Sequence, residues 1–319
     1  MHYDIFNGDA DGICALVQLR LASPIDSKLI TGVKRDISLV KQVSAQTGDQ
    51  LTILDISLDK NRAAVMTALE AGAEIFYADH HFAGEIPDHD KLDVHINTSA
   101  NTCTCLIVNG ILKDAHIGWA ITGAFGDNLN DSAKSLASRT SYSEDNIAQL
   151  KELGILINYN GYGASEADLH FRPAELFKIV LNYPEPLDFI NADAGHFQKL
   201  KQGYDADIAA AEAIDSDFDS ESVSVYILPN AAWARRVSGV FGNQLANQNP
   251  DKAHAVVTTK PDGNYMVSVR APLNNKTGAD EFCREYPSGG GRAAAAGIND
   301  LAVTELKDMM TRFDSHYQI

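Results

Sequence analysis

YDIFNGDADG, residues 3–12, places a short β-rich run directly before a glycine-flanked Asp-x-Asp pair. The run at residues 3–6 predicts a buried strand, and residues 11–21 follow helical spacing. Asp9 and Asp11 therefore lie in a tight turn between a strand and a helix, where both can point at one cavity. By itself, such a turn is also typical of an ordinary helix N-cap.

The same alternation of strands and helices continues along the N-terminal part of the chain. Further strands are expected at residues 28–31, 51–54, 73–78 and 93–96, with helices at 37–45 and 60–71. Strands separated by helices form parallel sheets with helices on both faces. We therefore expect an α/β fold with a doubly wound, mainly parallel five-stranded sheet.

The length and composition predict a second domain. A chain of 319 residues with 45% hydrophobic content can bury a full core, and its length suggests about two domains. We expect an N-terminal domain at residues 1–188, a helical connector at 189–220 and a smaller α/β domain at 221–319. The acidic stretch DSDFDSES belongs to the expected connector, because it packs poorly and hydrates well.

Charge and hydropathy narrow the functional classes. The formal net charge of -17 disfavours long nucleic acids, whose binding depends on Lys and Arg. Short oligonucleotides and nucleotides need only a few cationic anchors and a metal, so they remain compatible. No apolar stretch approaches the roughly 18 to 20 residues of a membrane helix, and the N-terminus lacks signal-peptide features. We expect a cytoplasmic protein that binds neither membranes nor long duplex DNA.

The four cysteines are Cys14, Cys103, Cys105 and Cys283. Cys103 and Cys105 are close in sequence, but a Cys-x-Cys pair without a second pair is a weak zinc signal. We interpret all four as reduced, buried packing residues.

Acidic and histidine residues also follow two later strands. Asp55 comes directly after the third expected strand, and Asp79-His80-His81 follows the fourth. Asp55 is also compatible with a helix cap, and consecutive histidines are often found in turns. Because ligands of open α/β sheets bind beyond the carboxyl ends of the strands, we expect these side chains to converge on the Asp-x-Asp pair. Clustered carboxylates and imidazoles are the donor set of a divalent-metal site that hydrolyses phosphoesters.

The order of these motifs resembles that of the DHH phosphoesterase superfamily, which includes RecJ-type exonucleases and nanoRNases. The matching stretches are NGDADG (7–12), LDIS (54–57), ADHH (78–81) and GDN (126–128). In addition, SGGGRAAAAG (288–297) is similar to the glycine-rich motif of the DHH-associated C-terminal domain. The resemblance thus covers most of the chain.

The resemblance implies a set of metal ligands and catalytic residues. Asp9 would hold a first ion and Asp55 would bridge two ions. The second ion would be held by Asp11, His80 and Asp127. His81 would lie beside the scissile phosphate, with Asp79 as the other catalytic residue of the tripeptide. The mixed carboxylate and imidazole set favours two Mn²⁺ ions, and Mg²⁺ is also compatible.

Two positions depart from the family pattern. Asn7 stands where RecJ-type members carry His or Asp, and its amide oxygen is a weaker, neutral metal ligand. Arg292 stands where the C-terminal motif usually has His, and its guanidinium can bind a phosphate but not transfer a proton near neutral pH.

The expected substrate site combines the glycine loop with arginines. Gly289, Gly290 and Gly291 are expected to form an anion-binding nest at the start of an Ala-rich helix. Arg292 and Arg270 are the further candidate phosphate anchors.

The resemblance implies a two-metal phosphoesterase that cleaves short oligonucleotides, dinucleotides or nucleotides, with a homodimer as an option. One alternative is an inorganic pyrophosphatase or polyphosphatase, although Ile5 stands where those enzymes have a histidine. The other alternative is a nucleotide-binding sensor with a decayed site, which Asn7 and Arg292 suggest.

Overall fold

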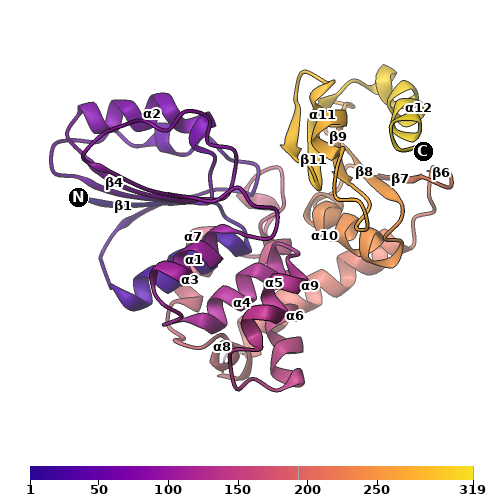
Figure 1. The fold of residues 1–319 in the computed structure, drawn as a ribbon. Coiled ribbons are helices and arrows are strands. Elements are labelled where there is room, and N and C mark those ends of the chain that lie inside the picture. Colours follow the sequence, from indigo (N-terminus) through magenta and orange to yellow (C-terminus); the bar gives the residue numbers. More distant parts are fainter. Residues whose placement is uncertain (193, 319) are drawn as a thin grey trace. The chain divides into compact units, whose positions relative to one another are not determined.

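The computed structural model describes residues 1–192 and 194–318. Its contacts divide the chain into two compact units, Met1–Lys201 and Gln202–Ile319 (Figure 1). The division falls within helix α9 (Ala194–Glu212). Each unit contains its own sheet and its own hydrophobic core.

The N-terminal unit is built on a five-stranded parallel sheet with the order β2-β1-β3-β4-β5. Its strands are β1 (His2–Phe6), β2 (Lys28–Ile30), β3 (Gln50–Leu54), β4 (Glu74–Asp79) and β5 (Leu92–Ile96). The strand order reverses between β1 and β3, so this sheet has its switch point there. The predicted doubly wound α/β fold is confirmed.

Helices cover both faces of this sheet. Helix α2 (Leu58–Glu70) lies on one face and α1 (Ala10–Ala22) on the other (Figure 1). The remaining helices of the unit are α3 (Thr104–Ile111), α4 (Ile117–Gly126), α5 (Asn130–Ala137), α6 (Glu144–Asn160), α7 (Pro173–Val180) and α8 (Pro186–Ala192). A 3₁₀ turn, Glu166–Asp168, precedes α7. Helix α1 packs against α3, α4 and α6, which explains why nearly all of its residues are buried.

The prediction of a helix at residues 37–45 is wrong. Only a 3₁₀ turn, Val40–Gln42, forms there. Leu39 and Val40 pack into the core with α2, and the Asn61 side chain accepts from the Val40 N–H and donates to the Ile37 carbonyl. The apolar spacing therefore reflects the packing of an irregular loop rather than a helical face.

The C-terminal unit contains a mixed six-stranded sheet in the order β10-β11-β9-β8-β7-β6. Its strands are β6 (Phe218–Asp219), β7 (Val223–Leu228), β8 (Ala253–Thr259), β9 (Tyr265–Arg270), β10 (Gly289–Arg292) and β11 (Ala295–Leu301). Its helices are α10 (Ala232–Gln248), α11 (Ala279–Arg284) and α12 (Leu306–Tyr317), with a 3₁₀ turn at Val303–Glu305. Phe282 of α11 and Phe313 of α12 join the core on one face of the sheet.

The prediction of an Ala-rich helix after Gly289, Gly290 and Gly291 is wrong. The glycines form strand β10, and the alanines turn back as β11, which pairs with both β10 and β9. Gly291 has φ 144°, and a Cβ there would lie 2.4 Å from the Ala296 Cα, so the two strands approach too closely for a side chain. Ile298 is fully buried, so pairing and burial override the helix propensity of alanine.

None of the helices within residues 1–192 and 194–318 combines the length and the apolar character needed to span a bilayer.

Close helix packing in the N-terminal unit makes one glycine sensitive to substitution. A Cβ on Gly154 of α6 would lie 2.2 Å from the Thr122 carbonyl oxygen of α4. We expect Gly154→Ala to destabilise the fold by about 1–3 kcal/mol, because the two backbones must separate. Gly110→Ala in α3 is the control, since nothing lies within 4 Å of its Cβ, and it should stabilise by up to about 1 kcal/mol. Urea unfolding of both variants tests this, and equal midpoints would contradict it.

Candidate metal centre and active site

The strand register brings three predicted site residues to one edge of the N-terminal sheet. Phe6, Leu54 and Ala78 are aligned across β1, β3 and β4, and each is followed directly by a polar residue. The Asn7 N–H donates to the Leu54 carbonyl at 3.2 Å, and the Asp55 N–H donates to the Ala78 carbonyl at 3.1 Å. Asn7, Asp55 and Asp79 therefore lie side by side at the switch point of the sheet, and all three are buried.

Asp9 and Asp11 reach this edge from the start of α1. Asp9 is the N-cap of α1, and its Oδ1 accepts from the Gly12 N–H at 3.1 Å. The two oxygens of Asp11 accept from the Thr104 and Cys105 N–H groups at 2.8 and 2.7 Å. These donors belong to the first turn of α3, where backbone N–H groups are otherwise unpaired and favour a carboxylate. Helix α3 thus fixes the carboxylate of Asp11.

Asp55 has an unusual backbone and an unusual charge environment. Its φ of 58° lies in the left-handed region, which non-glycine residues adopt rarely and often at functional sites. Its Oδ1 accepts from the Thr104 hydroxyl at 3.1 Å. Burial and the neighbouring carboxylates of Asp11, Asp9 and Asp79 raise the pKa of Asp55 well above its ordinary value. A cation at this edge would relieve that repulsion.

His80 presents one ring nitrogen to the carboxylates. Its Nδ1 lies 3.0 Å from the Thr102 carbonyl oxygen, so Nδ1 carries the hydrogen in the neutral ring. The lone electron pair of the neutral ring is then on Nε2, which lies 3.4 Å from Asp55 Oδ1 and 3.7 Å from Asp11 Oδ2. A backbone acceptor on the far nitrogen is the usual support of a metal-binding histidine.

His81 is paired with Asp79 instead. Its Nδ1 lies 2.7 Å from Asp79 Oδ1, which orients the ring, and the side chain is 33% exposed. The other oxygen, Asp79 Oδ2, is buried and has no hydrogen-bond partner among the described residues. Asp79 and His81 therefore form a carboxylate–imidazole pair beside the carboxylate cluster.

Asp127 joins the cluster from the end of α4, where it is the C-cap residue. One ligand atom each of Asp11, His80 and Asp127 lies within 4.8 Å of the others. The same holds for Asp55, His80 and His81. These two overlapping groups bring together five of the predicted site residues from four separate segments of the chain, whereas Asp9 and Asn7 belong to neither group.

Lys34, which no sequence pattern singles out, contacts the cluster from the loop after β2. Its ammonium forms an ion pair with Asp9 Oδ2 and donates to Asn158 Oδ1 at 3.2 Å. Burial alone would lower the pKa of Lys34, but the charges of Asp9, Tyr162 and Asp127 raise it above its ordinary value. Burial would likewise raise the pKa of Asp9, yet the Lys34 contact leaves it below its ordinary value.

The donor set fits divalent cations. Asn7 Oδ1 is buried without a hydrogen-bond partner among the described residues, while Asn7 Nδ2 donates to the Lys34 carbonyl at 3.2 Å. Asp79 Oδ2 likewise has no hydrogen-bond donor among the described residues. Buried oxygens without a donor need another positive partner, which a cation can supply. Carboxylates with one or two neutral imidazoles suit Mn²⁺ and also permit Mg²⁺.

The cysteines near the cluster have a different character. Cys103 Sγ and Cys105 Sγ lie 3.4 Å apart and come within ligand distance of Asp11. Both thiols are fully buried, and burial raises the pKa of Cys103 to about 12. The two cysteines pack at the start of α3, and their burial favours the protonated thiols. Thr104 between them, also missed from the sequence, supports the site through Asp11 and Asp55.

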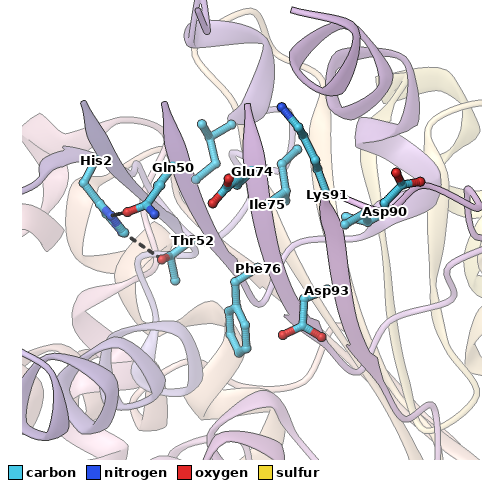
Figure 2. A pocket seen from close by; sticks show the side chains of 11 residues that line it. His2, Gln50, Thr52, Glu74, Ile75, Phe76, Asp90, Lys91 and Asp93 are labelled. Carbon is cyan, nitrogen blue, oxygen red and sulfur yellow. Dashed lines mark hydrogen bonds between the residues drawn. The ribbon is translucent and has the colours of Figure 1, made fainter. Parts of the chain in front are cut away.

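A cavity of about 580 Å³ lies on the sheet away from this cluster (Figure 2). It is lined by His2, Gln50, Leu51, Thr52, Glu74, Ile75, Phe76, Asp90, Lys91, Leu92 and Asp93. His2 bonds to Gln50 and Thr52 within it. None of the predicted site residues lines this cavity.

The predicted substrate residues all lie in the C-terminal unit. Across the aligned strands β9, β11 and β10, Arg270 pairs with Ala295, which pairs with Arg292. Cross-strand partners share a face, so the two arginines lie on the same face, two strand spacings or about 10 Å apart. Arg270 is buried, and its partners are neutral: Asn243 Oδ1 at 2.5 Å, the Val269 and Gly239 carbonyls at 3.0 and 3.1 Å, and Ser268 Oγ at 3.4 Å.

No protein-family model matches the chain, and no curated protein matches it by sequence. Solved structures do. A RecJ exonuclease bound to manganese has a TM-score of 0.65 at 16% identity, over 99% of this chain and 89% of that chain. RecJ from Thermus thermophilus, in complex with Mn²⁺, has a TM-score of 0.60 at 17% identity. There the match covers 99% of this chain but only 52% of the Thermus protein.

A pGpG-specific phosphodiesterase, PggH from Vibrio cholerae, matches along both whole chains. It has a TM-score of 0.57 at 15% identity, over 99% of this chain and 100% of that chain. At identities this low, the TM-scores establish a common fold and nothing more. Because the matches cover 99% of this chain, the shared fold includes both units. The chain therefore has the fold of RecJ exonuclease and of PggH, the fold that the resemblance of its NGDADG, LDIS, ADHH and GDN motifs implied.

Proposed function

We propose that this protein is a metal-dependent phosphoesterase that hydrolyses short oligonucleotides or dinucleotides with two divalent ions, Mn²⁺ in preference to Mg²⁺. One observation carries the proposal: Asp11, His80 and Asp127 converge beside Asp55 at the switch point of a parallel sheet. Exonucleases and a phosphodiesterase share this fold, and both exonucleases were solved with manganese.

In this proposal separate residues of the chain bind the ions and orient the substrate. Bound divalent ions would lower the pKa of a water molecule and neutralise phosphate oxygens. Asp9 and Asn7 would hold one ion, Asp11, His80 and Asp127 would hold the other, and Asp55 would contribute to both. His81, oriented by Asp79, would lie beside the scissile phosphate.

Phe82 favours a substrate that carries nucleobases. This residue directly follows His81, and its side chain is 74% exposed. Its own carbonyl oxygen is held by the Ser57 hydroxyl at 2.9 Å, so the backbone beneath the ring is anchored. An exposed aromatic ring beside a phosphoester site is suited to stacking on a base, which pyrophosphate lacks.

Arg270 and Arg292 are proposed to bind phosphate groups of the substrate. A buried guanidinium with only neutral partners, as at Arg270, is electrostatically incomplete without an anion. Arg292 on the same face adds a planar donor that suits phosphate. The glycines at 289–291 lie in strand β10 rather than at a helix N-terminus, and the Gly289 N–H already donates to the Tyr286 carbonyl at 2.9 Å, so the arginines rather than a glycine nest are the proposed anchors.

Two alternatives remain distinct from this proposal. A pyrophosphatase would release phosphate from pyrophosphate but leave dinucleotides intact. A decayed sensor would bind nucleotides without hydrolysing them, as the neutral Asn7 suggests.

A substrate panel with Mn²⁺ and with Mg²⁺ separates these functions. We expect the linear dinucleotides pApA and pGpG to be cleaved faster than long single strands, pyrophosphate or bis-p-nitrophenyl phosphate. His80→Ala should reduce this turnover at least about a hundredfold, because it removes a ligand that faces Asp11 and Asp55.

His89→Ala is the matched control, since His89 lies on a loop outside the carboxylate cluster, where its side chain accepts from the Lys91 N–H. It should retain full activity. Faster cleavage of long strands than of dinucleotides would refute the size preference, and nucleotide binding without turnover would support the sensor.

Phe82→Ala tests base stacking. We expect KM for the dinucleotide to rise about tenfold, the equivalent of about 1.4 kcal/mol of lost stacking, with kcat little changed. Ile86→Ala removes another exposed apolar side chain, 47% exposed in the wild-type protein, and should leave KM unchanged. Steady-state kinetics with Phe82→Trp should restore the wild-type KM; a KM for Phe82→Ala equal to that of the wild type would remove Phe82 from the substrate site.

Arg292→Met tests phosphate anchoring. Loss of a charged donor to phosphate should raise KM about ten- to a hundredfold. The control is Arg284→Met on α11, where the side chain is 61% exposed and pairs with Asp280. If both variants keep the wild-type KM for a 5′-phosphorylated dinucleotide, Arg292 is not an anchor.

A further inference from the structure

Lys34 is held in place along its whole length. Its N–H donates to the Gly161 carbonyl at 2.8 Å, and its own carbonyl accepts from Asn7 Nδ2 at 3.2 Å. The ammonium contacts Asp9 and Asn158 and lies 5.5 Å from the centre of the Tyr162 ring. The side chain is 24% exposed, so the charge is largely shielded from water. This is a fixed cation, not a surface lysine that meets a carboxylate by chance.

Lys34 makes the two halves of the carboxylate cluster unequal in charge: it contacts Asp9 in the half with Asn7, and not Asp11 in the half with His80 and Asp127. Both oxygens of Asp9 are engaged, Oδ1 by the Gly12 N–H and Oδ2 by the ammonium. A divalent ion that binds Asp9 must either displace Lys34 from Oδ2 or share the carboxylate with it, and in both cases the ion experiences the positive charge of the ammonium nearby.

The opposite half is built around Asp11, which no lysine or arginine of the described residues contacts. The two Asp11 oxygens accept backbone N–H groups of α3, and His80 turns Nε2 toward them with its Nδ1 bound to a carbonyl. These ligands keep electron pairs that can bind a cation, and the surrounding carboxylates attract one.

We propose that Lys34 is an internal competitor for one metal ion, so that the half with Asp11, His80 and Asp127 fills first and the half with Asn7 and Asp9 fills second and more weakly. Asp55 serves both halves. The inference rests on the metal centre of the proposed function. It assigns Lys34 a role in setting the order of ion binding.

Titration of the metal-free protein with Mn²⁺, followed by the electron paramagnetic resonance signal of the free ion, tests this order. The wild-type protein should bind a first ion tightly and a second ion more weakly. Lys34→Met should tighten the second step at least about tenfold and the first step much less, since the lost positive charge contacts Asp9 directly and has Asp127 only among its weaker electrostatic neighbours. Lys41→Met, at an exposed position outside the cluster, should leave both steps unchanged.

Thermal unfolding provides a second readout that also detects misfolding. In EDTA, Lys34→Met should melt below the wild-type protein, because Asp9 is then a buried carboxylate without its cation. Saturating Mn²⁺ should raise the melting temperature of Lys34→Met more than that of the wild type. Lys34→Gln, which keeps a hydrogen bond to Asn158, is the second variant and should show the same tightening.

An unchanged or weakened second step in both folded Lys34 variants would overturn the proposal, as would two equal steps in the wild-type protein. Neither readout depends on turnover. A protein that binds Mn²⁺ in this order but cleaves nothing in the substrate panel would refute the proposed function and leave the role of Lys34 intact.

Discussion

The repulsion among buried carboxylates at one edge of the N-terminal sheet is the constraint on which the rest of this unit depends. Asp9, Asp11, Asp55 and Asp79 are each at most 2% exposed and meet where the strand order reverses. Carboxylates in such a place need donors or cations. The fold supplies them through the first turn of α3, the N-terminus of α1, the His80 ring and the Lys34 ammonium.

The surrounding architecture follows from holding those groups in place. Helix α3 must begin where Asp11 can accept two of its N–H groups, and the tight packing of α1, α4 and α6 fixes the distances among the segments. The left-handed backbone of Asp55 is tolerated because Thr104 and the neighbouring strand both bind this residue. Strain and charge are thus concentrated at the same point of the sheet.

The two units would obtain the positive charge that faces a substrate from different sources. In the N-terminal unit, cations would be recruited to a carboxylate cluster, whereas in the C-terminal unit Arg270 and Arg292 are built into one face of a sheet. In a chain with a net charge of -17, such local anchors suit small anionic ligands better than long polyanions. Under the proposed function, the carboxylate cluster determines the reaction and the arginines contribute to the choice of substrate.

The sequence alone determined the parallel sheet and its convergent acidic strand ends, because strand periodicity and residues at strand ends are local properties. Only the tertiary structure decided which groups neutralise the cluster, since Lys34 and Thr104 come from loop and helix ends with no local signal. It also decided that the alanines near residue 295 form a strand, where pairing with β9 outweighs their intrinsic helix preference. Long-range pairing and charge neutralisation depend on residues far apart in the chain, and local patterns do not contain them.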